Sequence, residues 1–175
     1  RQRDVADIEI IAIDNSPEGS AARAFQTFAA ESTLPFRFAH EPRPGVAQAR
    51  NAALALARGR LVAWLDDDEE ATPTWLAALM RVRRQTGAQS VFGPVRAKAD
   101  GDHRAFFERL YSRSGPVQSG VVDRAYGMGN SLQPRAMFEE QPFDTSANQT
   151  GGEDDLLFAS WHDAGARFAW AADAW

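Results

Sequence analysis

Residues 61–70 read Leu-Val-Ala-Trp-Leu-Asp-Asp-Asp-Glu-Glu, an apolar run followed directly by five carboxylates. The apolar run, Leu61 to Leu65, predicts a buried strand. Neighbouring carboxylates repel one another by about 1 kcal/mol per pair in water, and by more beside a low-dielectric core. A bound divalent cation removes this cost, because Mg2+ and Mn2+ prefer oxygen ligands and often bridge them to the phosphates of a substrate.

The acidic block, residues 66–70, therefore predicts a metal–phosphate site at the carboxyl end of a strand. The alternative is a solvated acidic turn that leads into a helix, whose dipole tolerates negative charge. In open α/β sheets, ligands bind at the carboxyl ends of the strands, which is the position of this block. We therefore favour the functional interpretation.

Composition narrows the class of protein. The chain has 175 residues, of which 44% are hydrophobic, so it is long enough for one globular core. A net charge of −5 argues against a nucleic-acid partner, which requires a basic surface. The chain has no cysteine, which excludes disulfides and thiolate metal sites. It has no long apolar stretch and no secretory signal pattern, so we expect no membrane span in this chain and a cytoplasmic setting, with peripheral attachment to the inner membrane face left open.

Apolar runs alternate with helical patterns, which predicts an α/β fold with a mainly parallel sheet flanked by helices. We expect strands over residues 8–13, 35–40, 61–65, 90–95, 128–132 and 168–170. We expect helices over residues 20–30, 46–58, 72–87, 104–113 and 152–164. Thr72 is the expected N-cap of the third helix, and Gly59 and Gly165 have the position expected just past a helix end. The stretch 97–127 is less regular, and we find no clear domain boundary.

A second acidic position, Asp14, follows the first predicted strand within the turn cluster Asp14-Asn15-Ser16-Pro17. Because the carboxyl ends of parallel strands meet at one edge of a sheet, Asp14 and the acidic block are expected to face one crevice. The alternative is an Asx residue that only forms the turn.

Two further clusters begin helices. Glu153, Asp154 and Asp155 follow Gly151 and Gly152, a pattern that can aim a carboxylate into a cleft as a general base, or merely compensate the helix dipole. The helix that follows Pro44-Gly45 offers free N–H groups to an anion, and Arg43 and Arg50 add positive charge there. For both arginines, an exposed position on an amphipathic helix is the alternative.

These motifs, in this order, resemble the family 2 glycosyltransferases with the GT-A fold. The resemblance covers nearly the whole chain. Each motif alone is loose, and the order of the motifs along the chain makes the resemblance specific to this family. The matching segments are residues 9–16, 43–51, 59–69, 73–76, 129–131 and 152–156.

The resemblance implies a role for each matching residue. Asp14, with Asn15 beside it, would contact the nucleoside of a nucleotide-sugar donor, and Arg43 and Arg50 would assist donor binding. Asp66 and Asp68 would form the Asp-x-Asp pair, with Asp68 the direct ligand of Mn2+ or Mg2+ and Asp67 beside the nucleotide. Asp154 would be the catalytic base, and Glu153 would position the base or the acceptor.

The resemblance also implies an architecture: a single catalytic domain over residues 1–175, Rossmann-like and truncated at both ends. The central first strand of the family is expected before Arg1, and a histidine found in many relatives is expected beyond Trp175. In inverting transfer, the base and the groups that stabilise the leaving diphosphate act on opposite faces of the sugar, and the sequence has two separate carboxylate clusters.

The hypothesis is therefore a metal-dependent, inverting glycosyltransferase that moves a sugar from a nucleotide donor to a hydroxyl of a glycan or lipid-linked acceptor. The donor that we favour is a UDP-sugar. The irregular stretch 97–127 is expected to set acceptor specificity. A nucleotidyltransferase that consumes a nucleoside triphosphate is one alternative. A non-catalytic nucleotide-sugar-binding domain is another.

Overall fold

The structure is a computed structural model that describes residues 2–138, 142–146 and 152–175. The chain divides into two compact units. Unit 1 comprises Arg1–Val5, Ala63–Pro134 and Trp161–Trp175, and unit 2 comprises Ala6–Val62 and Arg135–Ser160. Among the described residues, no helix is both long and apolar enough to cross a bilayer.

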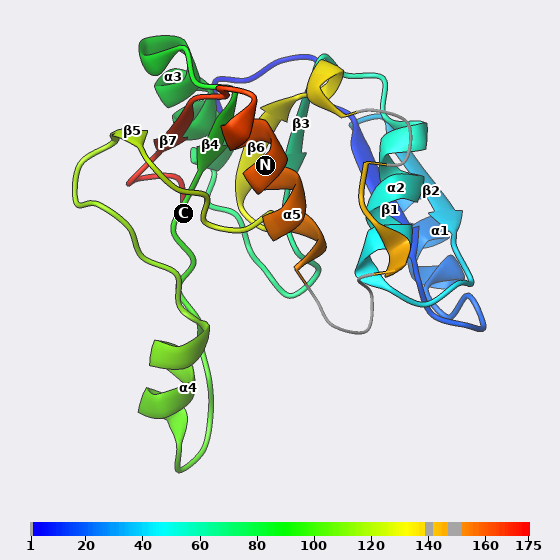
Figure 1. Ribbon diagram of the computed structural model, residues 1–175. Coiled ribbons are helices and arrows are strands. Elements are labelled where there is room, and N and C mark those ends of the chain that lie inside the picture. Colours follow the sequence, from blue (N-terminus) through cyan, green and yellow to red (C-terminus); the bar gives the residue numbers. More distant parts are fainter. Residues whose placement is uncertain (1, 139–141, 147–151) are drawn as a thin grey trace. The chain divides into compact units, whose positions relative to one another are not determined.

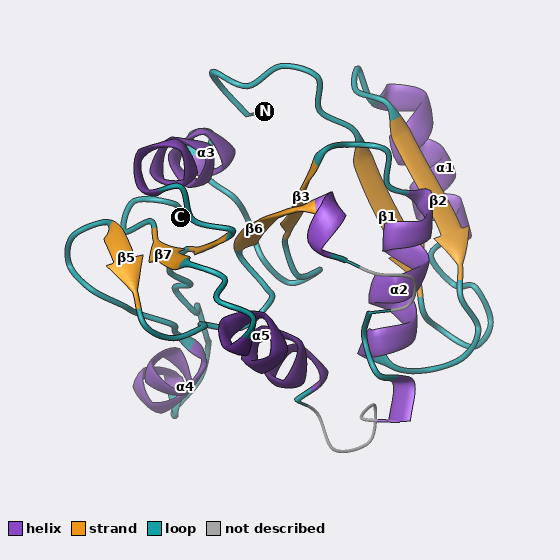
Figure 2. Cartoon of the chain, turned by 45° about the horizontal axis from the view of Figure 1, so that its top comes forward, coloured by secondary structure: helices purple, strands orange, loops and turns teal. Residues whose placement is uncertain are grey.

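Unit 2 is built on two parallel strands. β1 (Ile10–Asp14) pairs with β2 (Phe36–His40) in a register that runs from Ile10 opposite Phe36 to Asp14 opposite His40. α1 (Ala22–Glu31) and α2 (Val46–Leu56) cover opposite faces of this pair (Figure 2). The ring of Phe28 packs 4.8 Å from that of Phe36, so aromatic contacts hold α1 on the sheet.

One carboxylate joins the end of α2 to β1. Glu9 accepts hydrogen bonds from the backbone N–H groups of Arg58 and Gly59, each at 2.7 Å, and forms an ion pair with Arg37. Burial alone would raise the pKa of Glu9, but these hydrogen bonds outweigh it and lower the pKa. The helix ends at Leu56, before the predicted stop at Gly59, because the segment that follows turns to meet Glu9.

The larger sheet has the strand order β3-β6-β4-β7-β5 (Figure 1). Its strands are β3 (Leu61–Trp64), β4 (Ser90–Phe92), β5 (Gly120–Val122), β6 (Ser131–Pro134) and β7 (Phe168–Trp170). β4 runs parallel to β7, whereas β6 is antiparallel to β4, and β5 is antiparallel to β7. The α/β prediction is confirmed, with the difference that this sheet is mixed and separate from the β1–β2 pair.

Three helices and one short turn complete the described elements. They are α3 (Trp75–Thr86), α4 (Arg104–Tyr111), α5 (Glu153–Asp163) and a 3-10 turn over Arg135–Met137. α3 packs on the larger sheet through Leu79 and Val82, which are fully buried with Phe92 and Trp170 of the strands. This cluster is the core of unit 1.

The predicted N-cap of α3 is wrong. The helix begins at Trp75, and the Thr72 hydroxyl donates a hydrogen bond of 2.6 Å to the backbone oxygen of Trp175. The amide of Thr72 donates to the same oxygen at 2.8 Å. Thr72 therefore joins the start of α3 to the segment after β7, which the local sequence pattern does not indicate.

Candidate functional site

The acidic block forms a tight turn directly after β3. The amide of Glu69 donates to the Asp66 carbonyl at 3.1 Å, and the Glu69 carboxylate accepts a hydrogen bond of 3.3 Å from the Asp66 amide. Asp66, Asp67 and Asp68 are exposed, whereas Glu69 is half-buried. Burial raises the pKa of Glu69, and the charges of Asp66 and Asp68 raise it further, against the opposing effects of the hydrogen bond from the Asp66 amide and of Arg113. The turn therefore concentrates negative charge that one arginine offsets only in part.

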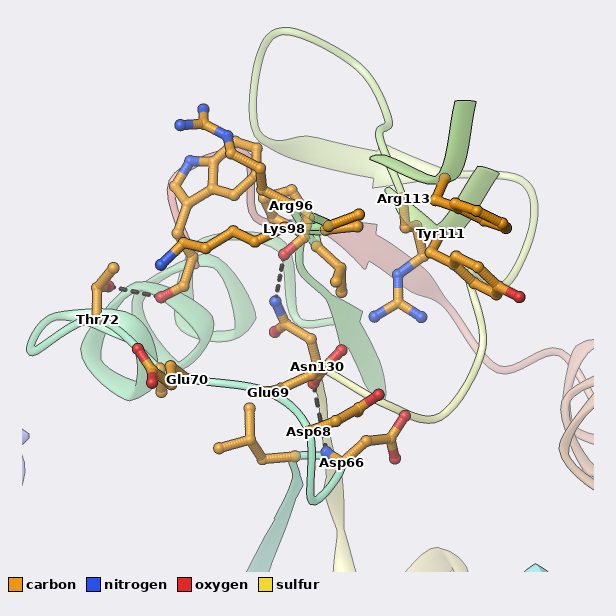
Figure 3. Close-up of a pocket in the computed structure, with 18 residues that line it drawn as sticks. Asp66, Asp68, Glu69, Glu70, Thr72, Arg96, Lys98, Tyr111, Arg113 and Asn130 are labelled. Carbon is orange, nitrogen blue, oxygen red and sulfur yellow. Dashed lines mark hydrogen bonds between the residues drawn. The ribbon is translucent and has the colours of Figure 1, made fainter. Parts of the chain in front are cut away.

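This turn lines a pocket of about 940 Å³ within unit 1 (Figure 3). Asp66, Asp68 and Glu69 lie at one end of the pocket, and Arg96 lies at the other. Asp67 is not among the lining residues. The other polar and aromatic residues that line it are Glu70, Thr72, Lys98, Phe107, Tyr111, Arg113, Asn130 and Trp175.

Gly129 provides the surface on which Asp66 rests. A β-carbon at Gly129 would overlap the Asp66 Oδ2 atom and would lie 2.9 Å from its Cγ atom. Any side chain at this position must therefore displace the Asp66 carboxylate. The residues that precede β6 thus set the position of a carboxylate that follows β3.

Asn130 holds three segments around the pocket. Its Oδ1 atom accepts a hydrogen bond of 2.7 Å from Trp75 Nε1, and its Nδ2 atom donates to the carbonyls of Pro94 at 2.6 Å and Ala174 at 2.8 Å. The residue is buried and has a φ of 49°, the left-handed region that asparagine tolerates better than most side chains. Asn130 therefore positions the start of α3, the segment after β4 and the segment after β7.

Arg113 was not identified from the sequence. Its Nε atom donates to the Gly93 carbonyl at 3.3 Å, it also hydrogen-bonds the Gly129 carbonyl, and its guanidinium points into the pocket (Figure 3). Arg96, also unpredicted, stacks 4.8 Å from the ring centre of Trp175. No local motif marks either arginine, because only the tertiary fold brings Arg113 beside the acidic turn and Arg96 to the other end of the same pocket.

In unit 2, Asp14 lies at the end of β1, as predicted, and both of its carboxylate oxygens are engaged. Oδ1 accepts from the Ser16 hydroxyl at 2.6 Å and the Ser16 amide at 3.0 Å, and Oδ2 accepts from the Ala21 amide at 2.6 Å. The hydrogen bond from the Ser16 hydroxyl is the main cause that lowers the pKa of Asp14. Asp14 thus forms an Asx turn, which was the alternative interpretation of this residue from the sequence. A contact with a nucleoside stays a prediction.

Asn15 connects this turn to the loop before α2. Its Nδ2 atom donates to the carbonyls of Glu41 at 2.7 Å and Arg43 at 2.8 Å, and its Oδ1 atom accepts from the Gly45 amide at 2.8 Å. Arg43 itself forms a two-pronged ion pair with Glu41, at 2.8 and 2.7 Å. Asn15 therefore holds the β2–α2 loop in place, and Arg43 is a mostly exposed partner of Glu41.

The stability of unit 2 is expected to fall in acid. The Arg43 side chain, aided by its amide, lowers the pKa of Glu41 to about 2. A lowered folded-state pKa stabilises the fold above the unfolded value, and this contribution is lost as the pH falls from about 5 toward about 2. Circular dichroism during acid titration measures the loss. Glu41→Gln should lose less stability over this range, and an unchanged acid transition would contradict the assignment.

Arg50 and Glu153 form a buried ion pair between α2 and the first turn of α5, with 12% and 5% of their side chains exposed. The guanidinium also lies 5.6 Å from the ring centre of Phe143. Glu153 thus fixes the start of α5, where Asp154 follows it, half-buried, with Oδ1 accepting from the Asp155 amide at 3.0 Å. Gly151, part of the predicted cluster, lies outside the described residues, and Gly152 has a φ of 87°.

The donor set of the acidic turn fits a divalent cation. Its side chains offer only carboxylate oxygens, which hard cations prefer, and it holds a half-buried glutamate beside two aspartates. No three acidic or histidine side chains converge as ligands anywhere in residues 2–138, 142–146 and 152–175. Mg2+ commonly takes only one or two protein carboxylates together with substrate phosphates, so Asp66 and Asp68 satisfy that requirement.

The sequence matches the model of glycosyl transferase family 2 over residues 1–170. The chain belongs to glycosyl transferase family 2. A relative from Rhizobium meliloti (strain 1021), the succinoglycan biosynthesis protein ExoM, is 32% identical over 179 residues, covering 97% of this chain and 56% of ExoM. The family predicted from the sequence is thus confirmed, and the chain spans about half the length of this relative.

Solved structures confirm the GT-A fold of this glycosyltransferase domain. Staphylococcus aureus TarS, crystallised with UDP, superposes with a TM-score of 0.71 at 15% identity, over 98% of this chain and 51% of TarS. GalNAc-T7, crystallised with UDP, GalNAc and Mn2+, gives a TM-score of 0.66 at 16% identity, over 95% of this chain and 38% of that protein. At these identities the likeness concerns the fold.

Proposed function

We propose that this glycosyltransferase domain belongs to an inverting, metal-dependent enzyme that transfers a sugar from a UDP-sugar to a hydroxyl of a glycan or lipid-linked acceptor. The observation that carries the proposal is the pocket in which Asp66 and Asp68 share a tight turn, opposite basic and aromatic side chains. Two relatives in fold are described with UDP, and the ExoM relative is described as a succinoglycan biosynthesis protein, which supports a glycan product.

Within this proposal, Asp68 and Asp66 hold the cation beside the donor diphosphate, with Asp67 on the same turn. The cation supplies Lewis-acid stabilisation of the charge that develops on the leaving diphosphate. Arg113, whose guanidinium points into the same pocket, adds a positive charge for that leaving group (Figure 3). Four residues of unit 2 are proposed to contribute to binding of the nucleotide part of the donor: Asp14, Asn15, Arg43 and Arg50. Asp14 and Asn15 would do so by shaping the loops after β1 and β2.

Asp154 is the proposed general base. It accepts the proton of the acceptor hydroxyl as the oxygen attacks the anomeric carbon, on the face opposite the departing diphosphate. Glu153 is its proposed positioning residue, because its pair with Arg50 fixes the helical turn that carries Asp154. Assignment of these roles to two different carboxylate clusters follows from inversion, which needs the base and the leaving group on opposite faces of the sugar.

Calorimetric titration with uridine, guanosine and thymidine diphosphates, each with and without Mn2+, tests the donor site. We expect UDP to bind in the presence of Mn2+, and Asp68→Ala to weaken this binding at least about tenfold, since even outer-shell changes at metal sites cost that much. Asp67→Ala, on the same turn but not lining the pocket, should have the smaller effect. Equal binding with and without Mn2+ would contradict metal dependence, and no binding of any diphosphate would contradict the donor site.

Gly129→Ala offers an independent test of the position of Asp66. The added methyl group overlaps the Asp66 carboxylate, so Mn2+-dependent binding of UDP is expected to weaken by about tenfold without loss of the fold. Gly120→Ala is the matched control in unit 1, because a β-carbon there meets no atom within 4 Å. If Gly129→Ala and Gly120→Ala bind UDP with equal affinity, Asp66 does not contribute to the Mn2+-dependent binding of UDP from its position beside Gly129.

A further inference from the structure

Two cationic side chains of the pocket lie away from the acidic turn. Arg96 and Lys98 belong to the segment that follows β4, and they line the pocket on the side away from Asp66 and Asp68 (Figure 3). Both side chains are exposed, whereas Ala97 between them is half-buried. The pocket therefore has an acidic end, to which the proposed function assigns the cation and the donor diphosphate, and a basic end with no assigned ligand.

Arg96 is held in place by an aromatic ring. Its guanidinium lies 4.8 Å from the ring centre of Trp175. The backbone oxygen of Trp175 accepts the hydrogen bonds from the hydroxyl and the amide of Thr72, so the residue under the guanidinium is itself fixed. Stacking on a ring orients a guanidinium but leaves its charge and the N–H donors along its edge available. Arg96 is therefore positioned as a donor without being neutralised.

No carboxylate of the described residues neutralises the basic end of the pocket. Arginines elsewhere pair with carboxylates, as the exposed Arg81 does. Within residues 2–138, 142–146 and 152–175, neither Arg96 nor Lys98 forms an ion pair, with Glu70 of the same pocket or with any other acid. The acidic residues at positions 100 and 102 do not line the pocket. Two like charges on one side of a pocket repel each other, and an anionic ligand removes that cost.

The chemistry of these two side chains selects a carboxylate or a phosphate. The planar fork of an arginine matches two oxygens of either group, and a lysine adds a point charge. The pocket, of about 940 Å³, is at the upper end of the sizes usual for ligand sites, so a second reactant has room beside the donor. The inference rests on the proposed function, in which the diphosphate of the donor binds at the acidic end. The anion at the basic end then belongs to the other reactant, the acceptor.

We propose that Arg96 and Lys98 bind an anionic group of the acceptor, either the carboxylate of an acidic sugar or the phosphate of a lipid-linked glycan. Arg96 supplies the two-pronged contact, and Lys98 supplies the second positive charge. The acceptor is thus an anionic saccharide, and these two residues select it over a neutral one.

Saturation-transfer NMR titrations with glucuronic acid, octyl phosphate and glucose test the proposal. The protein is free of metal, so that no probe binds through a cation at the acidic turn. We expect at least one of the two anions to bind more tightly than glucose. Arg96→Gln should weaken that binding about tenfold, between the effect of an exposed ion pair and that of a shielded, charged hydrogen bond. The anion that binds more tightly identifies the source, an acidic sugar or the phosphate of a lipid-linked glycan.

Arg109→Gln is the matched control. It removes the same charge from an exposed position on α4, and Arg109 does not line the pocket. Because the side chains of both Arg96 and Arg109 are exposed, circular dichroism should show an unchanged fold for either variant.

Three results would overturn the proposal. The first is equal binding of the anions and glucose, or no binding of any probe. The second is equal weakening by Arg96→Gln and Arg109→Gln. The third comes from calorimetry with Mn2+: tighter binding of UDP-glucuronic acid than of UDP-glucose, with a difference that Arg96→Gln removes, would place the anion on the donor sugar. The proposed function fails on a separate result, the absence of UDP binding with Mn2+, on which the metal-free titrations do not depend.

Discussion

Asp154→Asn is expected to lower the turnover of sugar transfer by about 10²–10⁴-fold, the usual contribution of a positioned general base. The amide retains the size of the side chain and its ability to accept a hydrogen bond from the Asp155 amide, so α5 should begin as before. It cannot take the proton of the acceptor hydroxyl. Binding of UDP with Mn2+, which the proposal assigns to the acidic turn, should remain unchanged.

Single-turnover transfer from a UDP-sugar, measured alongside calorimetric binding of UDP, separates these two effects. Asp155→Asn is the matched control, because Asp155 belongs to the same helical turn and is exposed. Full turnover by Asp154→Asn would exclude Asp154 as the base. Retained anomeric configuration in the product would reject the inverting mechanism itself. An unaltered protein that binds a UDP-sugar and never turns it over would favour the non-catalytic alternative.

The second large effect concerns stability. Arg50→Ala is expected to lower the free energy of unfolding by about 3–5 kcal/mol, because it leaves the Glu153 carboxylate buried without its counter-charge. Both side chains are largely shielded, at 12% and 5% exposure. Alanine is the residue best suited to a helix, so the loss would come from the pair rather than from α2. Urea unfolding followed by far-ultraviolet circular dichroism, which reports on the helices of both units, measures it.

Two comparisons make this result interpretable. Arg81→Ala removes an exposed pair with Asp173, 44% and 57% exposed, and should cost no more than about 1 kcal/mol. Replacing the buried pair by Arg50→Met with Glu153→Leu should destabilise less than Arg50→Ala alone, since no charge is then left unpaired. Equal losses for Arg50→Ala and Arg81→Ala would show that the buried pair has no special role.

Local patterns predicted most of the elements. β7 has the predicted bounds, Phe168–Trp170, because a short apolar run between turn residues admits few other structures. β5, by contrast, lies in a stretch described as irregular, and it is a strand because it pairs with β7. Residues 120–122 have no strong strand pattern of their own, and they form a strand because they pair with β7, which is distant in the sequence. A prediction from local sequence cannot detect such pairing.

The candidate site divides in the same way. The acidic block at the end of β3 and the carboxylate at the end of β1 are visible in the sequence, because each follows an apolar run, and ligands bind at the carboxyl ends of strands in open α/β sheets. Arg113 and the Gly129 contact with Asp66 are not visible, since they depend on the order of strands in the sheet. Glu153 and Arg50 were both predicted as site residues, Glu153 beside the base and Arg50 at the donor, but the sequence does not indicate that they form a buried ion pair.

The dependence of Asp66 on Gly129 also governs when this pocket can exist. β3 lies at the end of the strand order, and β6 is its neighbour in that sheet. During synthesis from the amino terminus, the acidic turn leaves the ribosome long before Gly129 and β6, so β3 then lacks its neighbour β6, and Asp66 lacks the contact with Gly129. The pocket is thus completed late, and a nascent chain that ends before Met128 carries its five carboxylates without a formed site.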